Sequence, residues 1–386
     1  MPQATKGTSF AHLDFVLAGV VMTMLGPLLP AFAARWSLND TQAGYLFTAQ
    51  YASSVAGMLV SGVLVTRRGY RITMIAGLVL MSAGIALVAR AEWVLGFAAI
   101  GIYGVGFGVT TPAVNLFVAN ANPERRASAL NLVNSSWGIG AMGCPVLIAL
   151  AQRGQKIPVF LYALAVVLAA LAFALTRVRF AIDGEKTIAG NTTSSHPDGP
   201  HWAWLLVVPA MFFTYVGTEN AVGGWVAAYA RRIEPAAHSF STIVPSFFWG
   251  ALLVGRASAP LALRRMREMR LAASGVALAA LGVIVLLMAK SALWVACGSA
   301  IAGLGLSSIY PIKISLMPRW FGGSMDRIGG IAFALGNLGG AVLPWVVGAV
   351  STHSGNLRTG FLVPLCGTVI LLSFYLANLF AHRTPA

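Results

Sequence analysis

The chain has 386 residues, of which 58% are hydrophobic and only 10% are charged, and its formal net charge is +15. A soluble globular protein carries about 25% charged residues, because its surface faces water. This composition excludes a soluble globular protein and a disordered one, and it indicates an integral membrane protein. The three cysteines lie in apolar runs and cannot all pair, so they are interpreted as small core residues and not as a disulfide framework.

Apolar runs of about 20 residues recur along the chain, which is the length that crosses about 30 Å of hydrocarbon as a helix. Strands of a membrane barrel would be about 10 residues long with alternating polarity. The runs predict spans at residues 11–34, 41–66, 71–89, 93–118, 127–151, 157–176, 202–230, 238–261, 270–289, 291–317, 327–350 and 359–381. We therefore predict an all-α integral membrane protein with twelve transmembrane helices in two six-helix, pseudo-symmetric bundles.

One long polar stretch, residues 177–201, separates the first six spans from the last six. It predicts an N-terminal bundle over 1–176, a cytoplasmic linker, and a C-terminal bundle over 202–386. Most Lys and Arg residues fall in loops on the side of this linker and of both termini, which predicts cytoplasmic termini in the cell (inner) membrane. Because these charges are spread over many loops, we expect no nucleic-acid partner.

The two halves share a pattern of glycines and prolines that indicates an internal duplication, a plan common among secondary transporters. Small residues precede a proline in both the fifth and the eleventh predicted span, which lets neighbouring backbones approach and leaves a kink. Three pairs of residues have the same spacing of 199 positions, and these are Pro112 with Pro311, Gly140 with Gly339, and Pro145 with Pro344.

The sequence has no nucleotide-binding P-loop, no zinc-protease or serine-hydrolase motif, and no Cys/His metal cluster. We therefore expect no cofactor, no metal and no enzymatic activity, and any transport would use a gradient or run downhill. The glycine-rich run at 101–108 lies inside a predicted span and not at a strand-to-helix turn. It indicates close helix packing instead of dinucleotide binding.

Ionisable side chains inside the hydrocarbon cost about 2.5–3.5 kcal/mol on insertion scales, so each is a candidate for function. Glu219 is the only acidic residue far inside a predicted span, and Lys313 is the only basic one. They are the candidate coupling residues, either as a buried pair that opens when a proton or substrate arrives, or as a pair that only neutralises charge. Lys313 is also a candidate to bind a substrate carboxylate. Asp14, near the cytoplasmic end of the first span, is predicted to be an interfacial residue near a helix N-terminus, favoured there by the helix dipole, and a coupling role is the alternative.

The segment between the second and third spans, residues 62–71, reads GVLVTRRGYR. It resembles the signature loop of the major facilitator superfamily, although Thr66 stands where that loop usually has an acidic residue. In the eighth span, residues 248–256 contain Phe-Trp-Gly and a later Gly-Arg, and they resemble the corresponding motif of sugar-transporting branches. The resemblance implies a gating role for Arg67, Arg68, Gly69 and Arg256. For the basic residues of the loop the alternative is a role as inside-positive signals.

The seventh span is similar to the fucose–proton symporter branch of that superfamily, in which a glutamate precedes Gly-Gly-Trp. Residues 212–225 read FFTYVGTENAVGGW, and the fifth-span string at 130–138 reads LNLVNSSWG. The branch typically has a polar side chain facing the sugar at the position of Asn134. Its acidic residues in spans one and four correspond here to Gly26 and Thr111, so its proton relay does not carry over.

The resemblance further implies that spans one, four, seven and ten line a central cavity, with Glu219 and Lys313 on opposing walls. Amides and hydroxyls suit a neutral polyol, and aromatic rings suit its apolar face. The alternative for each is interhelical hydrogen bonding or packing. The predicted substrate-binding residues are Thr110, Thr111, Asn115, Asn134, Trp137, Asn220, Trp225, Tyr229, Trp249, Tyr310 and Asn337.

Together these features predict a secondary active transporter that imports a small polar, monosaccharide-like solute by proton symport with alternating access. The expected partners are the solute, the lipid bilayer and H+ as the coupling ion, with Na+ left open, and the expected state is a monomer. One alternative is an organic-anion carrier that uses Lys313, and another is an exporter of drugs or organic ions by proton antiport. A non-transporting receptor or a membrane-embedded enzyme is the alternative from a different class.

Overall fold

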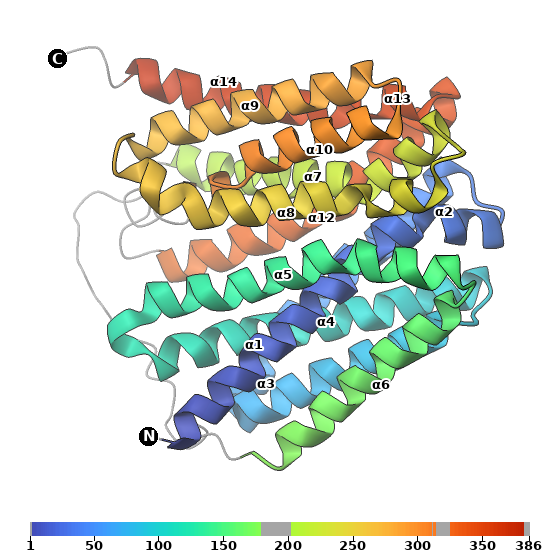
Figure 1. The fold of residues 1–386 in the computed structure, drawn as a ribbon. Helices are drawn as coiled ribbons and strands as arrows, with labels where there is room; N and C mark the ends of the chain where they lie inside the picture. Colours follow the sequence, from blue (N-terminus) through green and yellow to red (C-terminus); the bar gives the residue numbers. More distant parts are fainter. Residues whose placement is uncertain (1, 179–201, 311, 314–324, 382–386) are drawn as a thin grey trace. The chain divides into compact units, whose positions relative to one another are not determined.

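The computed structural model describes residues 2–178, 202–310, 312–313 and 325–381 (Figure 1). These residues are helices joined by short turns, and no strand occurs among them. They form two compact units. Residues 38–45 belong to the second unit together with the described residues from 202 onward, and the other residues up to 178 form the first.

The first unit contains the helices coloured blue to green in Figure 1. Helix α1 packs against α4 and α5, and α5 also packs against α6. Most of the α1–α2 span is buried inside the protein, because neighbouring helices cover it. The helices are α1 (Pro2–Thr23), α2 (Leu25–Arg35), α3 (Asp40–Val88), α4 (Trp93–Ala121), the short 3-10 helix η1 (Pro123–Arg125), α5 (Arg126–Arg153) and α6 (Ile157–Thr176). Residues 40–45 at the start of α3 belong to the second unit.

The second unit contains the helices coloured yellow-green to red in Figure 1. Helix α7 packs against α8, α12 and α14, while α10 packs against α8 and α9. The helices are α7 (Trp202–Ile233), α8 (His238–Leu263), α9 (Glu268–Met288), α10 (Ala292–Leu306), α12 (Met325–Ser354), α13 (Leu357–Gly360) and α14 (Leu362–Ala381).

Nine helices in the described part of the chain are long and apolar enough to cross a membrane. One of them, α3, is 49 residues long and contains Gly69 with φ 80°, so it joins the predicted spans 41–66 and 71–89 across a kink. Only glycine adopts such a φ without strain. Helix α7 is not among the nine, and it is the helix whose apolar run is interrupted by Glu219 and Asn220.

Two predicted spans are each divided into two helices at a proline. Pro27 lacks the N–H that would bond to the carbonyl of Thr23, and the helix breaks there between α1 and α2. Pro364 stands in the same relation to Gly360, where α13 and α14 divide. The predicted span 291–317 is interrupted, because α10 ends at Leu306 before a turn at 307–308. Residues 309–310 and 312–313 are helical again, and residues 311 and 314–317 lie outside the described part.

The internal duplication is visible in how the helices touch. A Cβ at Gly140 of α5 would collide with the carbonyl oxygen of Val16 on α1. A Cβ at Gly339 of α12 would collide in the same way with the carbonyl oxygen of Phe213 on α7. The two glycines that the sequence pairs at one spacing therefore occupy the same helix–helix contact in each unit.

Candidate functional site

Three charged side chains are buried among the residues that the structure describes. They are Asp14 on α1, Glu219 on α7 and Lys313, which lies beyond the end of α10. A charge taken out of water needs a partner or a function.

Glu219 is held by an arginine from the next helix. The Nη2 atom of Arg256 on α8 lies 3.5 Å from the Oε2 atom of Glu219, and this oxygen accepts no hydrogen bond from the described residues. The same Nη2 atom donates to the hydroxyl of Tyr215, one turn before Glu219 on α7, at 3.4 Å. The guanidinium also lies over the ring of Tyr310, 5.8 Å from its centre. The carboxylate thus depends on one loose ion pair, while the arginine has further partners.

Lys313 is not the partner of Glu219, in contrast to the predicted buried pair. Its Nζ atom donates to the backbone carbonyl of Met211 at 2.6 Å. It lies 4.8 Å from the ring centre of Tyr215 and 5.4 Å from that of Phe212. Tyr215, one turn before Glu219, contacts both Lys313 and Arg256, but only Arg256 forms an ion pair with the carboxylate in the described part of the chain. The sequence placed both charges inside spans but did not show which cation would pair with Glu219.

Asp14 is fully buried, so the prediction that it is an interfacial residue is wrong. The physical reason is that α1 begins at Pro2, well before the predicted start at residue 11, which puts Asp14 in the middle of a helix. The hydroxyl of Thr110 on α4 donates to its Oδ2 atom at 2.8 Å. Among the described residues, its Oδ1 atom has no hydrogen-bond partner and no cation forms an ion pair with it.

Further polar side chains of the first unit link α4 and α1 to α5. The amide of Asn134 donates to the side-chain oxygen of Asn115 at 3.2 Å, and His12 is bonded to Ser136 at 2.7 Å. The hydroxyl of Thr111 is buried without a hydrogen-bond partner in the described part. The structure therefore brings Asn115 and Asn134 together as a pair of amides. Trp137 lies half-buried on α5.

In the second unit, several predicted site residues use their polar atoms in contacts between helices. Trp225 donates its indole N–H to the carbonyl of Pro344 at 2.8 Å, and Tyr229 donates its hydroxyl to the carbonyl of Leu286 at 2.9 Å. Trp249 packs against Gly223, where a Cβ would collide with the indole ring.

The remaining predicted residues of both units lie as follows. Asn220 bonds to the carbonyl of Val216 within α7, and Asn337 is half-buried on α12. Tyr310 lies beside Tyr215, with 6.0 Å between the ring centres. Arg67 and Arg68 are exposed on α3 next to the kink at Gly69.

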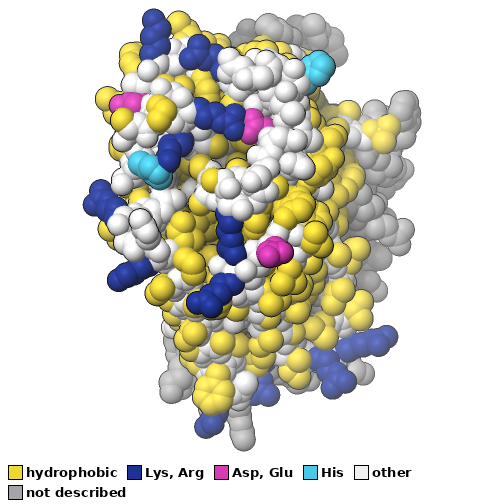
Figure 2. All heavy atoms as spheres, turned by 90° about the vertical axis from the view of Figure 1, so that its right-hand side faces the viewer, with side chains coloured by type: hydrophobic (Ala, Val, Ile, Leu, Met, Phe, Trp, Pro, Cys, Tyr) yellow, Lys and Arg dark blue, Asp and Glu magenta, His cyan; other side chains and the backbone are white. Residues whose placement is uncertain are grey.

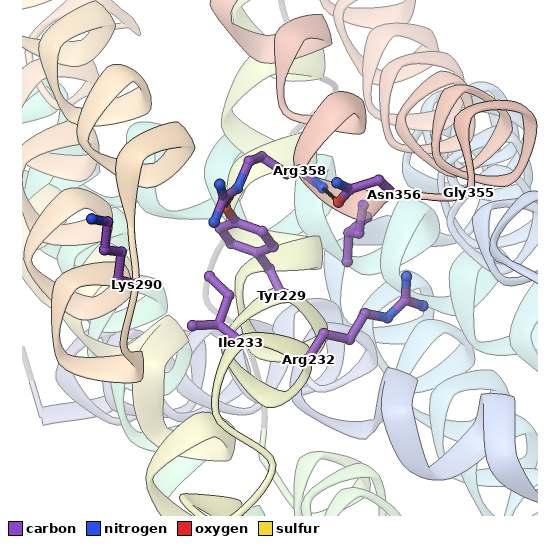
Figure 3. A pocket seen from close by; sticks show the side chains of 8 residues that line it. Tyr229, Arg232, Ile233, Lys290, Gly355, Asn356 and Arg358 are labelled. Carbon is purple, nitrogen blue, oxygen red and sulfur yellow. Dashed lines mark hydrogen bonds between the residues drawn. The ribbon is translucent and has the colours of Figure 1, made fainter.

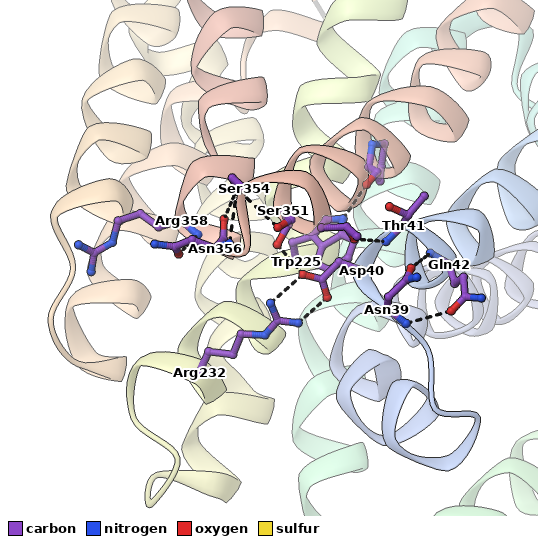
Figure 4. Close-up of polar contacts among 12 residues, drawn as sticks. Asn39, Asp40, Thr41, Gln42, Trp225, Arg232, Ser351, Ser354, Asn356 and Arg358 are labelled. Carbon is purple, nitrogen blue, oxygen red and sulfur yellow. Dashed lines mark hydrogen bonds and ion pairs between the residues drawn. The ribbon is translucent and has the colours of Figure 1, made fainter.

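A polar cluster that the sequence did not predict lies where residues 38–45 meet the rest of the second unit (Figure 4). The carboxylate of Asp40 accepts two bonds from the guanidinium of Arg232, one of them at 2.7 Å, and a further bond from the hydroxyl of Ser351. Asn39 and Gln42 bond reciprocally to each other's backbone N–H and cap the start of α3. An asparagine followed three positions later by a glutamine is a sequence pattern that could have indicated the start of a helix here.

Comparisons with known proteins agree with this architecture. Residues 15–344 match the family described as Major Facilitator Superfamily. The L-fucose-proton symporter of Escherichia coli (strain K12) is 24% identical in an alignment 408 positions long that covers 93% of this chain and 90% of that protein. The glucose/mannose transporter GlcP of Bacillus subtilis (strain 168) is 19% identical in an alignment 355 positions long that covers 88% of this chain and 86% of that protein. The solved structure of the nucleoside transporter NupG has the same fold, with a TM-score of 0.75 at 12% identity over 98% of this chain and 99% of that one.

Proposed function

Because the chain belongs to the Major Facilitator Superfamily, we propose that it imports a small polar, monosaccharide-like solute across the membrane by proton symport with alternating access. Two relatives are named for the transport of such solutes, one for fucose and one for glucose and mannose. The observation that carries the proposal is Glu219, a buried carboxylate whose only ion-pair partner in the described part of the chain is Arg256.

In this proposal a proton reaches Glu219 and neutralises its carboxylate, so that the ion pair with Arg256 is lost. The arginine is not left without partners, because the hydroxyl of Tyr215 and the ring of Tyr310 remain beside it. A cation over an aromatic ring is stabilised by about 0.5–2 kcal/mol, which lowers the cost of breaking the pair. Protonation of Glu219 would therefore cost less free energy than protonation of a carboxylate whose cationic partner is left without other contacts.

Side chains that both donate and accept hydrogen bonds would bind the solute. The amides of Asn115 and Asn134 are bonded to each other between α4 and α5, and the hydroxyl of Thr111 has no hydrogen-bond partner in the described part. Groups of this kind match sugar hydroxyls, which also donate and accept. We assign Lys313 a positioning role beside Tyr215, because its ammonium is already bonded to the carbonyl of Met211.

The test is solute accumulation by the purified protein in sealed vesicles, with glucose, mannose and fucose as probes and an imposed proton gradient. We expect Glu219→Gln to abolish accumulation driven by the gradient while it leaves exchange of labelled for unlabelled sugar across the membrane. A neutral glutamine keeps the shape of the side chain but cannot release a proton.

Glu234→Gln is the matched control, because Glu234 follows the end of α7 and its carboxylate accepts from the backbone N–H of Ala292. We expect this variant to accumulate sugar as the wild type does. Accumulation by Glu219→Gln that equals the wild type at every pH would exclude the coupling role. No movement of any sugar by the wild type, with organic acids transported instead, would replace the proposed solute class.

A further inference from the structure

A pocket of about 550 Å³ lies in the second unit, where α7 ends and α12 passes into α13 (Figure 3). We call it the cationic pocket, because three of its eight lining residues are Arg232, Lys290 and Arg358 and none is acidic. The linker precedes α7, so this pocket is at the opposite end of that helix. The space-filling view of the end of the protein on which α13 lies shows more Lys and Arg than Asp and Glu side chains (Figure 2).

Arg358 is fixed in the pocket by neutral groups only. Its Nε atom donates to the hydroxyl of Tyr229 at 3.2 Å, and its Nη2 atom donates to the carbonyl of Ala289 at 2.9 Å. The Tyr229 hydroxyl in turn donates to the carbonyl of Leu286. These bonds hold the guanidinium in one place, but no carboxylate among the described residues neutralises it. An arginine held in this way is ready to bind an oxyanion, because little side-chain entropy is left to lose.

Lys290 adds a second cation that has no hydrogen bond and no ion pair in the described part of the chain. Glu234, the acidic residue of the loop after α7, directs its carboxylate to the backbone N–H of Ala292, two residues after Lys290. Figure 3 shows the guanidinium of Arg358 on the side of the pocket where Lys290 lies, with the ammonium of Lys290 directed away from it. Because Lys290 is exposed and forms no bond in the described part of the chain, its side chain can turn toward an anion at Arg358.

Arg232 lines the same pocket but is engaged elsewhere. Its guanidinium points away from Lys290 and forms the two bonds to Asp40, whose carboxylate also accepts from Ser351 (Figures 3 and 4). The carboxylate of Asp40 thus removes one of the three positive charges from the pocket. Release of that ion pair would return the charge to it.

We propose that the cationic pocket binds one small oxyanion, a carboxylate or a phosphate, between Arg358 and Lys290, and that this anion competes with Asp40 for Arg232. The three cations are exposed, so water and salt screen their attraction for the anion. We therefore expect an affinity of about millimolar order that falls as ionic strength rises. This inference does not rest on the proposed sugar substrate, because none of the side chains near Glu219 takes part.

One substitution in the pocket, at Arg358, and one at Asp40, the ion-pair partner of Arg232, should change the affinity for the anion in opposite directions. Arg358→Gln removes the fixed cation, and we expect binding about tenfold weaker, the usual effect of losing a hydrogen bond to a charged group. Asp40→Asn frees Arg232 for the anion, and we expect binding about threefold tighter. A general loss of folding cannot produce this opposite pair of changes.

The measurement is calorimetric titration of the purified protein in detergent with inorganic phosphate and with citrate, against sodium chloride at equal ionic strength. Lys290→Gln serves as a second variant, because it breaks no internal bond of the described structure and so leaves folding intact. We expect it to weaken binding about threefold. Arg231→Gln is the matched control, because it removes the same charge one residue away from Arg232 but outside the pocket, and its affinity should equal that of the wild type.

A lipid headgroup offers the same phosphate chemistry, and nanodiscs separate the two sources. Phosphate binding that depends on Arg358 in phosphatidylcholine nanodiscs identifies a free anion as the ligand. A rise in melting temperature that requires phosphatidylglycerol and disappears in Arg358→Gln identifies a headgroup. Either result supports the site. Equal affinities in the wild type, Arg358→Gln and Lys290→Gln, with no lipid effect that depends on Arg358, would overturn it.

Discussion

The two units share one helix contact but carry different charges beside it. In the first unit Gly140 packs against the backbone of Val16, and in the second Gly339 packs against that of Phe213. These matching contacts are more direct evidence that the two bundles are equivalent than the common spacing of 199 positions in the sequence. They show that the duplication has kept the close approach of α1 to α5 and of α7 to α12.

Two residues before each contact, the units differ. In the first, Asp14 accepts a bond from Thr110 of α4. In the second, the carbonyl of Met211 accepts a bond from Lys313 beyond α10. The same place in the fold thus holds a buried acid in one unit and a buried base in the other. The packing between helices is the same in both units, whereas the buried charged residues differ. The charged residues are therefore better candidates for function than the packing contacts.

The largest expected effect on stability tests the helix contact that the two units share. Gly140→Leu and Gly339→Leu each push a side chain into a backbone carbonyl, which cannot move without separating two helices. We expect both to destabilise the protein by about 3 kcal/mol or more, and by similar amounts. The check is the melting temperature of the purified variants. Gly143→Leu is the control, because a Cβ at Gly143 meets nothing within 4 Å, and a strong effect in only one of the two glycine variants would break the equivalence.

A smaller effect tests the ion pair of the second unit. Glu219→Gln leaves the guanidinium of Arg256 without an anion, and we expect a loss of about 2 kcal/mol in stability. Glu219→Gln combined with Arg256→Gln removes both charges and should recover most of the stability that Glu219→Gln alone loses. A double-mutant cycle on melting temperature measures this coupling. A cycle whose effects simply add would mean that the two side chains do not stabilise each other.

The sequence was sufficient to predict the helices, because apolar runs of the right length have no other stable form in a bilayer. It did not predict their breaks where a proline lies inside an apolar run, as at Pro27, since hydropathy does not register a missing N–H. Gly69 was singled out as a gating residue, and its positive φ makes it the kink of α3.

The candidate site was harder to predict, because it depends on which side chains from different helices come into contact in the folded protein. Glu219 was identified from its charge inside a predicted span and from the seventh-span motif, but its partner Arg256 was predicted as a gating residue and Lys313 was expected in its place. Asp40 and Arg232 are separated by 192 positions, and no local pattern connects them. Asp14 was misplaced because the polar residues before it continue the helix.

The smallest effect is expected at Asp14, and it sharpens the contrast with Glu219. Asp14→Asn keeps an oxygen that accepts from Thr110 and leaves no cation behind, so we expect a change in stability below about 1 kcal/mol. Thr110→Val removes the donor instead and leaves the buried carboxyl without a hydrogen bond, which should cost about 1–2 kcal/mol. Melting temperatures of both variants test this order. If Asp14→Asn were as destabilising as Glu219→Gln, Asp14 would have a charged partner beyond the described residues, and the two units would be alike in charge as well as in packing.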